Sequence, residues 1–148
     1  MTFNELCEYY LNLTKDERIK RASYYAKKYL GFCKKHTDNY HKAVGLFVGS
    51  LVPFFGVDRE VDNDEYNFFI ELTKINDVSF DEFYDIVSRW TKVKVIEQSN
   101  LLVEECAKED EKEAFCHLGL CLITANNFIN RDEYLLAIKY LEKKISFK

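Results

Sequence analysis

An acidic stretch is the densest group of side chains in this sequence that could do chemistry. Five carboxylates fall within eight residues, at Asp58, Glu60, Asp62, Asp64 and Glu65. Ca²⁺ and Mg²⁺ take oxygen ligands, and carboxylates at alternating positions of a loop can converge on one ion. The stretch therefore predicts a divalent-cation site (Ca²⁺ or Mg²⁺). Its candidate ligands are Asp58, Glu60, Asp62 and Glu65.

Helix capping is the alternative explanation of the same stretch. Asp62 and Glu65 have the spacing of a capping box, in which each side chain accepts a hydrogen bond from an unpaired backbone amide. Asp58 and Glu60 precede that helix and gain less from its dipole, so solvent, a lysine or a cation must offset their repulsion. The stretch is not an EF-hand, because Phe69 stands where the bidentate glutamate would be needed. Capping and cation binding both remain open.

A second charged segment is basic. Residues 15–42 hold nine Lys or Arg and three acids, although the whole chain carries a formal charge of −4. Three basic pairs recur every seven residues and would share one side of a helix: Lys20 with Arg21, Lys27 with Lys28, and Lys34 with Lys35. Such a face is either merely solvated, or it binds an anionic partner such as nucleic acid or phospholipid headgroups.

Cysteines and histidines do not form a recognisable site in the sequence. Cys116 and Cys121 are five residues apart, off the same helical face, and the chain has no Cys-x-x-Cys pair of the kind that structural zinc uses. No spacing pairs a nucleophile with a base, so we expect no catalytic residue and no enzymatic activity. Five cysteines is an odd number, and the N-terminus lacks a signal-peptide pattern, so we expect a reduced, cytoplasmic protein.

The elements that would position these residues are helices. Capping-box spacings begin at Thr2, Thr14, Asp62, Ser79 and Asn130, and the apolar residues between them recur with helical periodicity. One proline and five glycines argue against a turn-rich sheet protein. We therefore predict an all-α, single-domain bundle of six to eight helices. The expected helices span 2–12, 14–36, 39–55, 62–75, 79–90, 92–107, 109–125 and 130–145.

The third of these expected helices has two further features. Gly45 and Gly49 are four residues apart, which would let a neighbouring helix approach closely. Pro53 should kink or end the helix just before the acidic stretch. The apolar run 43–57 is too short to span a membrane.

An internal repeat appears when the chain is shifted against itself by 68 residues. Residues 57–66 then lie over residues 125–134, each preceded by an apolar helix and followed by a capped one. This pattern predicts two helical hairpins around a pseudo-twofold axis. We assign residues 39–148 to this duplicated core and residues 1–38 to N-terminal helices that pack on it.

The repeated loop resembles that of the TerB-like family, named for tellurite-resistance operons, whose hallmark is Ala-Asp-Gly-x-Ile/Val-Asp/Ser-x-x-Glu between two helices. The first match comprises residues 57–62 and Glu65, and the second includes Ala125 and Ile129. Arg59 and Asn127 replace the family's glycine. The counterparts of the cation ligands in the second loop are Asn126, Asn130, Asp132 and Glu133.

This resemblance implies an all-helical, non-enzymatic module for stress response, sensing or interaction, with a divalent cation held on the first loop. Its partner would most simply be another protein. The alternative is that the basic segment 15–42 binds nucleic acid or phospholipid headgroups. Neither the residues nor the resemblance indicates an oligomeric state.

Overall fold

The computed structural model describes residues 2–51, 54, 63–90, 109–125, 135 and 139 of the 148-residue chain. These residues form helices and no strands, which confirms the all-α prediction. The helices are α1 (Phe3–Leu11), α2 (Lys15–Lys35), α3 (Tyr40–Ser50), α4 (Asn63–Thr73), α5 (Phe80–Trp90) and α7 (Glu109–Ala125). Leu135 and Lys139 are also helical. Apart from these two residues, the helices predicted over 92–107 and 130–145 lie outside the described residues, so the pseudo-twofold pairing of hairpins stays a prediction.

Local capping decides where the first two helices begin. Thr2 accepts a hydrogen bond from the Glu5 amide at 3.1 Å, and Glu5 accepts one from the Thr2 amide. Thr14 and Glu17 make the same reciprocal pair, at 3.2 and 3.0 Å. Both capping boxes are therefore confirmed. At the start of α5 the Glu82 amide donates to the Ser79 hydroxyl at 3.1 Å, as predicted.

Two features of α3 differ from the prediction. The helix ends at Ser50, with Leu51 as its C-cap, and does not continue to residue 55. Pro53 explains the early end, because the residue before a proline avoids the helical conformation. The prediction that Gly45 lets a neighbouring helix approach closely is also wrong. A Cβ at this glycine would meet no atom of another element within 4 Å. At the other end Asn39 caps the helix by accepting from the His41 amide at 2.7 Å.

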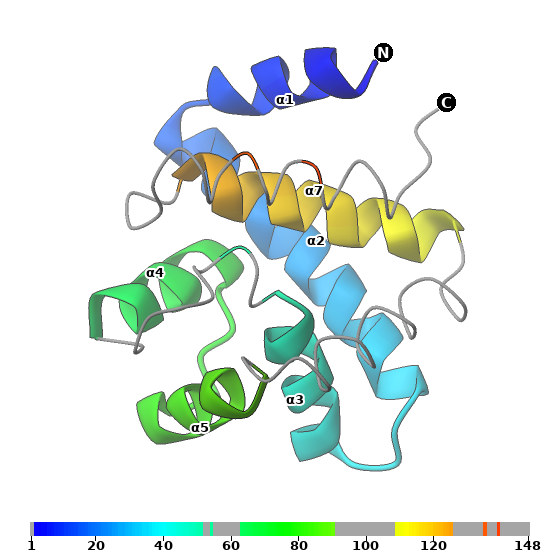
Figure 1. Ribbon diagram of the computed structural model, residues 1–148, viewed down its shortest axis with the longest axis vertical. Helices are drawn as coiled ribbons and strands as arrows, with labels where there is room; N and C mark the ends of the chain where they lie inside the picture. Colours follow the sequence, from blue (N-terminus) through cyan, green and yellow to red (C-terminus); the bar gives the residue numbers. More distant parts are fainter. Residues whose placement is uncertain are drawn as a thin grey trace.

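The long helix α2 organises the bundle. It packs most extensively against α7 and also contacts α3 and α4, while α1 lies on α7 and α5 packs on α3 and α4. Figure 1 shows α1 above α7, with α3, α4 and α5 on the opposite side of α7. α1 and α2 contribute side chains to the same buried cluster as the later helices.

A chain of aromatic rings runs through the core and links five helices. Phe115 of α7 lies 5.1 Å from Tyr29 of α2, centroid to centroid, and Tyr29 lies 5.7 Å from Phe47 of α3. Phe47 is followed at 6.1 Å by Phe69 of α4, and Phe69 at 4.9 Å by Phe83 of α5. All five side chains are buried. Such ring pairs add roughly 0.5–1.5 kcal/mol each beyond the apolar area they bury.

Candidate anion-binding site

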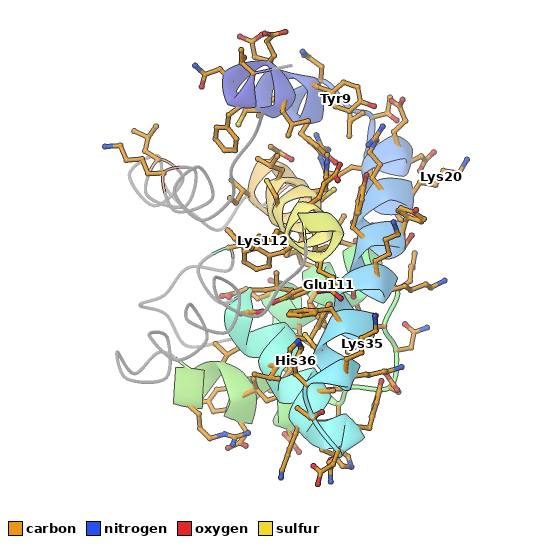
Figure 2. All side chains as sticks on the ribbon, turned by 90° about the vertical axis from the view of Figure 1, so that its right-hand side faces the viewer. Tyr9, Lys20, Lys35, His36, Glu111 and Lys112 are labelled. Carbon is orange, nitrogen blue, oxygen red and sulfur yellow. The ribbon has the colours of Figure 1, made fainter. Side chains whose placement is uncertain are left out.

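The solvent-facing side of α2 is rich in lysine. Between Arg18 and Thr37 the chain holds seven Lys or Arg and no acid. Five of the six predicted anion-binding residues are exposed on α2: Lys20, Lys27, Lys28, Lys34 and Lys35. The opposite side of the helix is apolar and buried, at positions such as Ala22, Ala26 and Cys33. We call the exposed side the basic face. Its ends, at Lys20 and Lys35, are labelled in Figure 2 and lie about 22 Å apart at 1.5 Å per helical residue.

Arg21, the sixth predicted residue, is directed toward α1. Its guanidinium lies over the rings of Tyr9 and Tyr10, at 4.9 and 5.7 Å from their centroids. It also donates a hydrogen bond to the Tyr9 hydroxyl at 2.6 Å. Arg21 therefore takes part in packing α1 onto α2 and is only partly exposed.

A hollow of about 260 Å³ interrupts the basic face at Gly31. Lys27 and Lys28 line it from the turn before the glycine, and Lys35 lines it from the turn after. α7 supplies Glu111 at one edge. A Cβ at Gly31 would meet no atom within 4 Å, so the missing side chain leaves open space between the lysines.

The charges around this hollow are unequal. Three ammonium groups face one carboxylate, whose Oε1 lies 3.7 Å from the Lys35 Nζ. The Lys35 side chain is 71% exposed, whereas the Glu111 side chain is only 13% exposed, so the carboxylate lies at the inner edge of the hollow. Lys28 lies over the ring of Tyr24 at 5.0 Å. With three lysines and one glutamate in its lining, the hollow is a net positive site.

The structure also contains a buried polar cluster that sequence reasoning missed. The Tyr10 hydroxyl lies 2.5 Å from Nδ1 of His117, and the Tyr25 ring stacks on the imidazole at 4.6 Å. Glu113 Oε1 lies 3.6 Å from Nε2 of His117. Burial lowers the pKa of His117 and raises that of Tyr10. Because Tyr10 and His117 are 107 residues apart, no local spacing indicates this contact.

The cysteines that the structure describes are all in the interior. Cys33, Cys116 and Cys121 are buried, and burial raises the pKa of each thiol, to about 12 for Cys33 and Cys121. Within the ranges that the structure describes, no three His, Cys, Asp or Glu side chains gather as metal ligands. No described helix has the length and apolar character needed to cross a membrane.

Most residues of the predicted cation site lie outside the described residues. These are Asp58, Glu60 and Asp62 of the first loop, and Asn126, Asn130, Asp132 and Glu133 of the second. Glu65 is described and is 3% exposed on α4. The cation site therefore stays a prediction.

Comparisons with known proteins give no function for this chain, so its function is inferred from the geometry described above. No protein-family model matches the chain, and no curated protein or solved structure matches it significantly.

Proposed function

We propose that this protein is a non-enzymatic binding module whose basic face on α2 binds phosphate groups of an anionic partner. The observation that carries the proposal is the run from Arg18 to Thr37, which has seven cations and no acid and exposes five lysines on one helix. Phosphate oxygens accept hydrogen bonds from ammonium groups, and the release of counterions drives such binding. The net charge of −4 makes this attraction local to the face.

The hollow at Gly31 is the point on the face best suited to a phosphate. Lys27 and Lys28 lie four and three residues before the glycine, and Lys35 lies four residues after it, so all three can reach one anion above the missing side chain. The exposed ring of Tyr24 lies beside Lys28 and can stack on a base or lie at a lipid headgroup.

A matched pair of double variants tests this function. Lys27→Gln/Lys28→Gln removes two charges at the hollow, and Lys74→Gln/Lys139→Gln removes two exposed charges outside the basic segment. Each protein is titrated with fluorescent single-stranded DNA and with vesicles containing phosphatidylserine, at several salt concentrations. The partner class is the one that binds more tightly at low salt.

The expected result is steep salt dependence, with the logarithm of affinity falling linearly against the logarithm of salt. Each lost phosphate contact should lower the slope by roughly 0.7 for a single strand. The Lys27/Lys28 variant should therefore bind more weakly and with a shallower slope, and the control should match wild type. Absence of binding to both probes at low salt, or equal loss in the two variants, would contradict the proposal.

The resemblance of this loop to that of the TerB-like family supplies a second proposal, a cation that orders the loop at Asp58, Glu60, Asp62 and Glu65. Its support is the motif alone. Millimolar Ca²⁺ or Mg²⁺ should raise the melting temperature of wild type, since a ligand at 100 times its dissociation constant stabilises by ~2.7 kcal/mol. Asp58→Ala should abolish that shift. An unchanged melting temperature in wild type would remove the cation from the proposal.

A further inference from the structure

A second cavity lies on another part of the molecule, at the junction of α2, α4 and α7. It measures about 400 Å³ and opens beside the first turns of α2, the second half of α4 and the end of α7. This volume falls within the range of roughly 300–1,000 Å³ that small-molecule sites occupy. Figure 1 shows α4 close to the ends of α2 and α7 that form this junction.

The wall of this cavity is divided into an apolar and a polar part. Ile19, Phe68, Leu72 and Ala125 supply apolar surface, and each also packs at the edge of the core or within it. The mouth carries an ion pair, with Lys15 Nζ 3.0 Å from Glu71 Oε1 and side chains that are 78% and 47% exposed. The cavity can therefore hold an apolar body inside and leave water at its entrance.

Arg18 is a charged group of the lining that is held in a fixed position. Its Nη2 donates to the Tyr10 carbonyl at 2.8 Å, and its Nε donates to the Thr124 hydroxyl at 3.2 Å. Thr124 in turn donates to the Leu120 carbonyl at 2.7 Å. The guanidinium is thus held in one place before any ligand arrives, which lowers the entropic cost of binding.

Both acceptors that hold Arg18 are uncharged. Among the residues that the structure describes, no carboxylate lies within ion-pair distance of Arg18, and Glu71 is engaged by Lys15. A guanidinium has five N–H groups, and the two bonds named above use two of them. The remaining donors can form the parallel pair of hydrogen bonds that a carboxylate accepts.

We propose that this cavity binds a small monocarboxylate with an apolar body, its carboxylate on Arg18 and its body against Ile19, Phe68 and Leu72. Lys15 and Glu71 neutralise each other at the mouth, so Arg18 is the one unbalanced charge of the lining that the structure describes and matches a monocarboxylate better than a dicarboxylate or a phosphate. This site differs from the basic face in position and in ligand. An experiment can therefore refute the proposal for this cavity without refuting the proposal for the basic face, and the reverse also holds.

Isothermal titration calorimetry with three probes tests the proposal. Octanoate carries both the charge and the apolar body, 1-octanol carries only the body, and acetate carries only the charge. Octanoate should bind saturably to wild type with one site, at least about tenfold more tightly than either of the other probes. Equal affinity for octanoate and 1-octanol, or no saturable binding of octanoate, would overturn the proposal.

Three variants locate the site. Arg18→Gln should weaken octanoate binding at least about tenfold and leave 1-octanol binding unchanged. Ala125→Phe should fill the cavity and abolish binding of both ligands while Arg18 stays in place. Lys27→Gln on the basic face is the control and should bind octanoate as wild type does. If Arg18→Gln does not fold, Ala125→Phe and the two-ligand comparison decide; unchanged octanoate binding in a folded Ala125→Phe protein refutes the site.

Discussion

Lowering the pH should destabilise this protein through His117. The imidazole is 8% exposed and is enclosed by Tyr10 from α1, by Tyr25 and Arg21 from α2, and by Glu113 on its own helix. Loss of hydration lowers the pKa of His117 most, the positive charge of Arg21 lowers it further, and Glu113 opposes both. The folded protein therefore resists protonation of this ring more strongly than the unfolded chain does.

The sign and size of the effect follow from this difference. The unfolded histidine titrates near its usual pKa of 6.5. Below that pH the unfolded chain takes up a proton that the folded protein does not, so the free energy of unfolding falls as pH falls. The stabilisation is complete above pH ~6.5 and declines by up to about 1.4 kcal/mol per pH unit until the folded pKa is reached.

Urea unfolding followed by circular dichroism, from about pH 7.5 to about pH 5, measures this slope. His117→Gln removes the titrating group and keeps an acceptor for the Tyr10 hydroxyl, so its stability should be nearly flat over this range. The chain has three histidines, and the double variant His36→Gln/His41→Gln removes the two exposed ones as a control. The control should keep the wild-type slope.

The reasoning is refuted if His117→Gln shows the same slope as wild type, or if wild type gains stability as pH falls through this range. The capping carboxylate Glu17 does not confuse the result. Hydrogen bonds from the Thr14 amide and hydroxyl lower the pKa of Glu17 below 4.5. The stabilisation that Glu17 contributes is therefore present above pH 4.5 and is lost only at lower pH, below the range in which unfolding is measured.

Three further predictions concern stability and are read as changes in the urea midpoint. Thr14→Ala should cost about 0.5–2 kcal/mol, because it unpairs the Glu17 amide at the start of α2; a neutral result would mean that water replaces the cap. Phe69→Ala should cost about 3–5 kcal/mol, because Phe69 is fully buried in the chain of aromatic rings, and a loss below ~1 kcal/mol would contradict that placement. Gly45→Ala should stabilise by roughly 0.5–1 kcal/mol, since the new methyl group meets no atom of a neighbouring element within 4 Å; destabilisation would show a contact there.

Helix starts were predictable because capping is local. Thr2 and Thr14 each interact with a glutamate three residues later, so four consecutive residues contain the whole interaction. The end of α3 was less predictable. Pro53 indicates that the helix ends nearby, but a proline does not fix how many residues before it the helix ends, and α3 ends at Ser50. Apolar periodicity predicted α7 over 109–125, which agrees with the observed helix.

The basic face was predictable in part, and Arg21 is the predicted residue that does not lie on it. A seven-residue spacing places all six cations on one side of a helix, and five of them are exposed. Arg21 is directed toward Tyr9 and Tyr10 because α1 packs on α7 beside the start of α2, and no property of residues 15–35 encodes that direction.

The amino-acid sequence alone determined that the chain forms helices, where α1 and α2 begin, and which side of α2 carries the lysines. Each of these depends on groups separated by one or two helical turns. Tertiary structure alone decided that Tyr10 meets His117, that Glu111 borders the hollow at Gly31, and that Arg18 enters a cavity. These sites join residues about 80 to 107 positions apart, so they exist only once α7 has packed against α1 and α2 and removed water from between them.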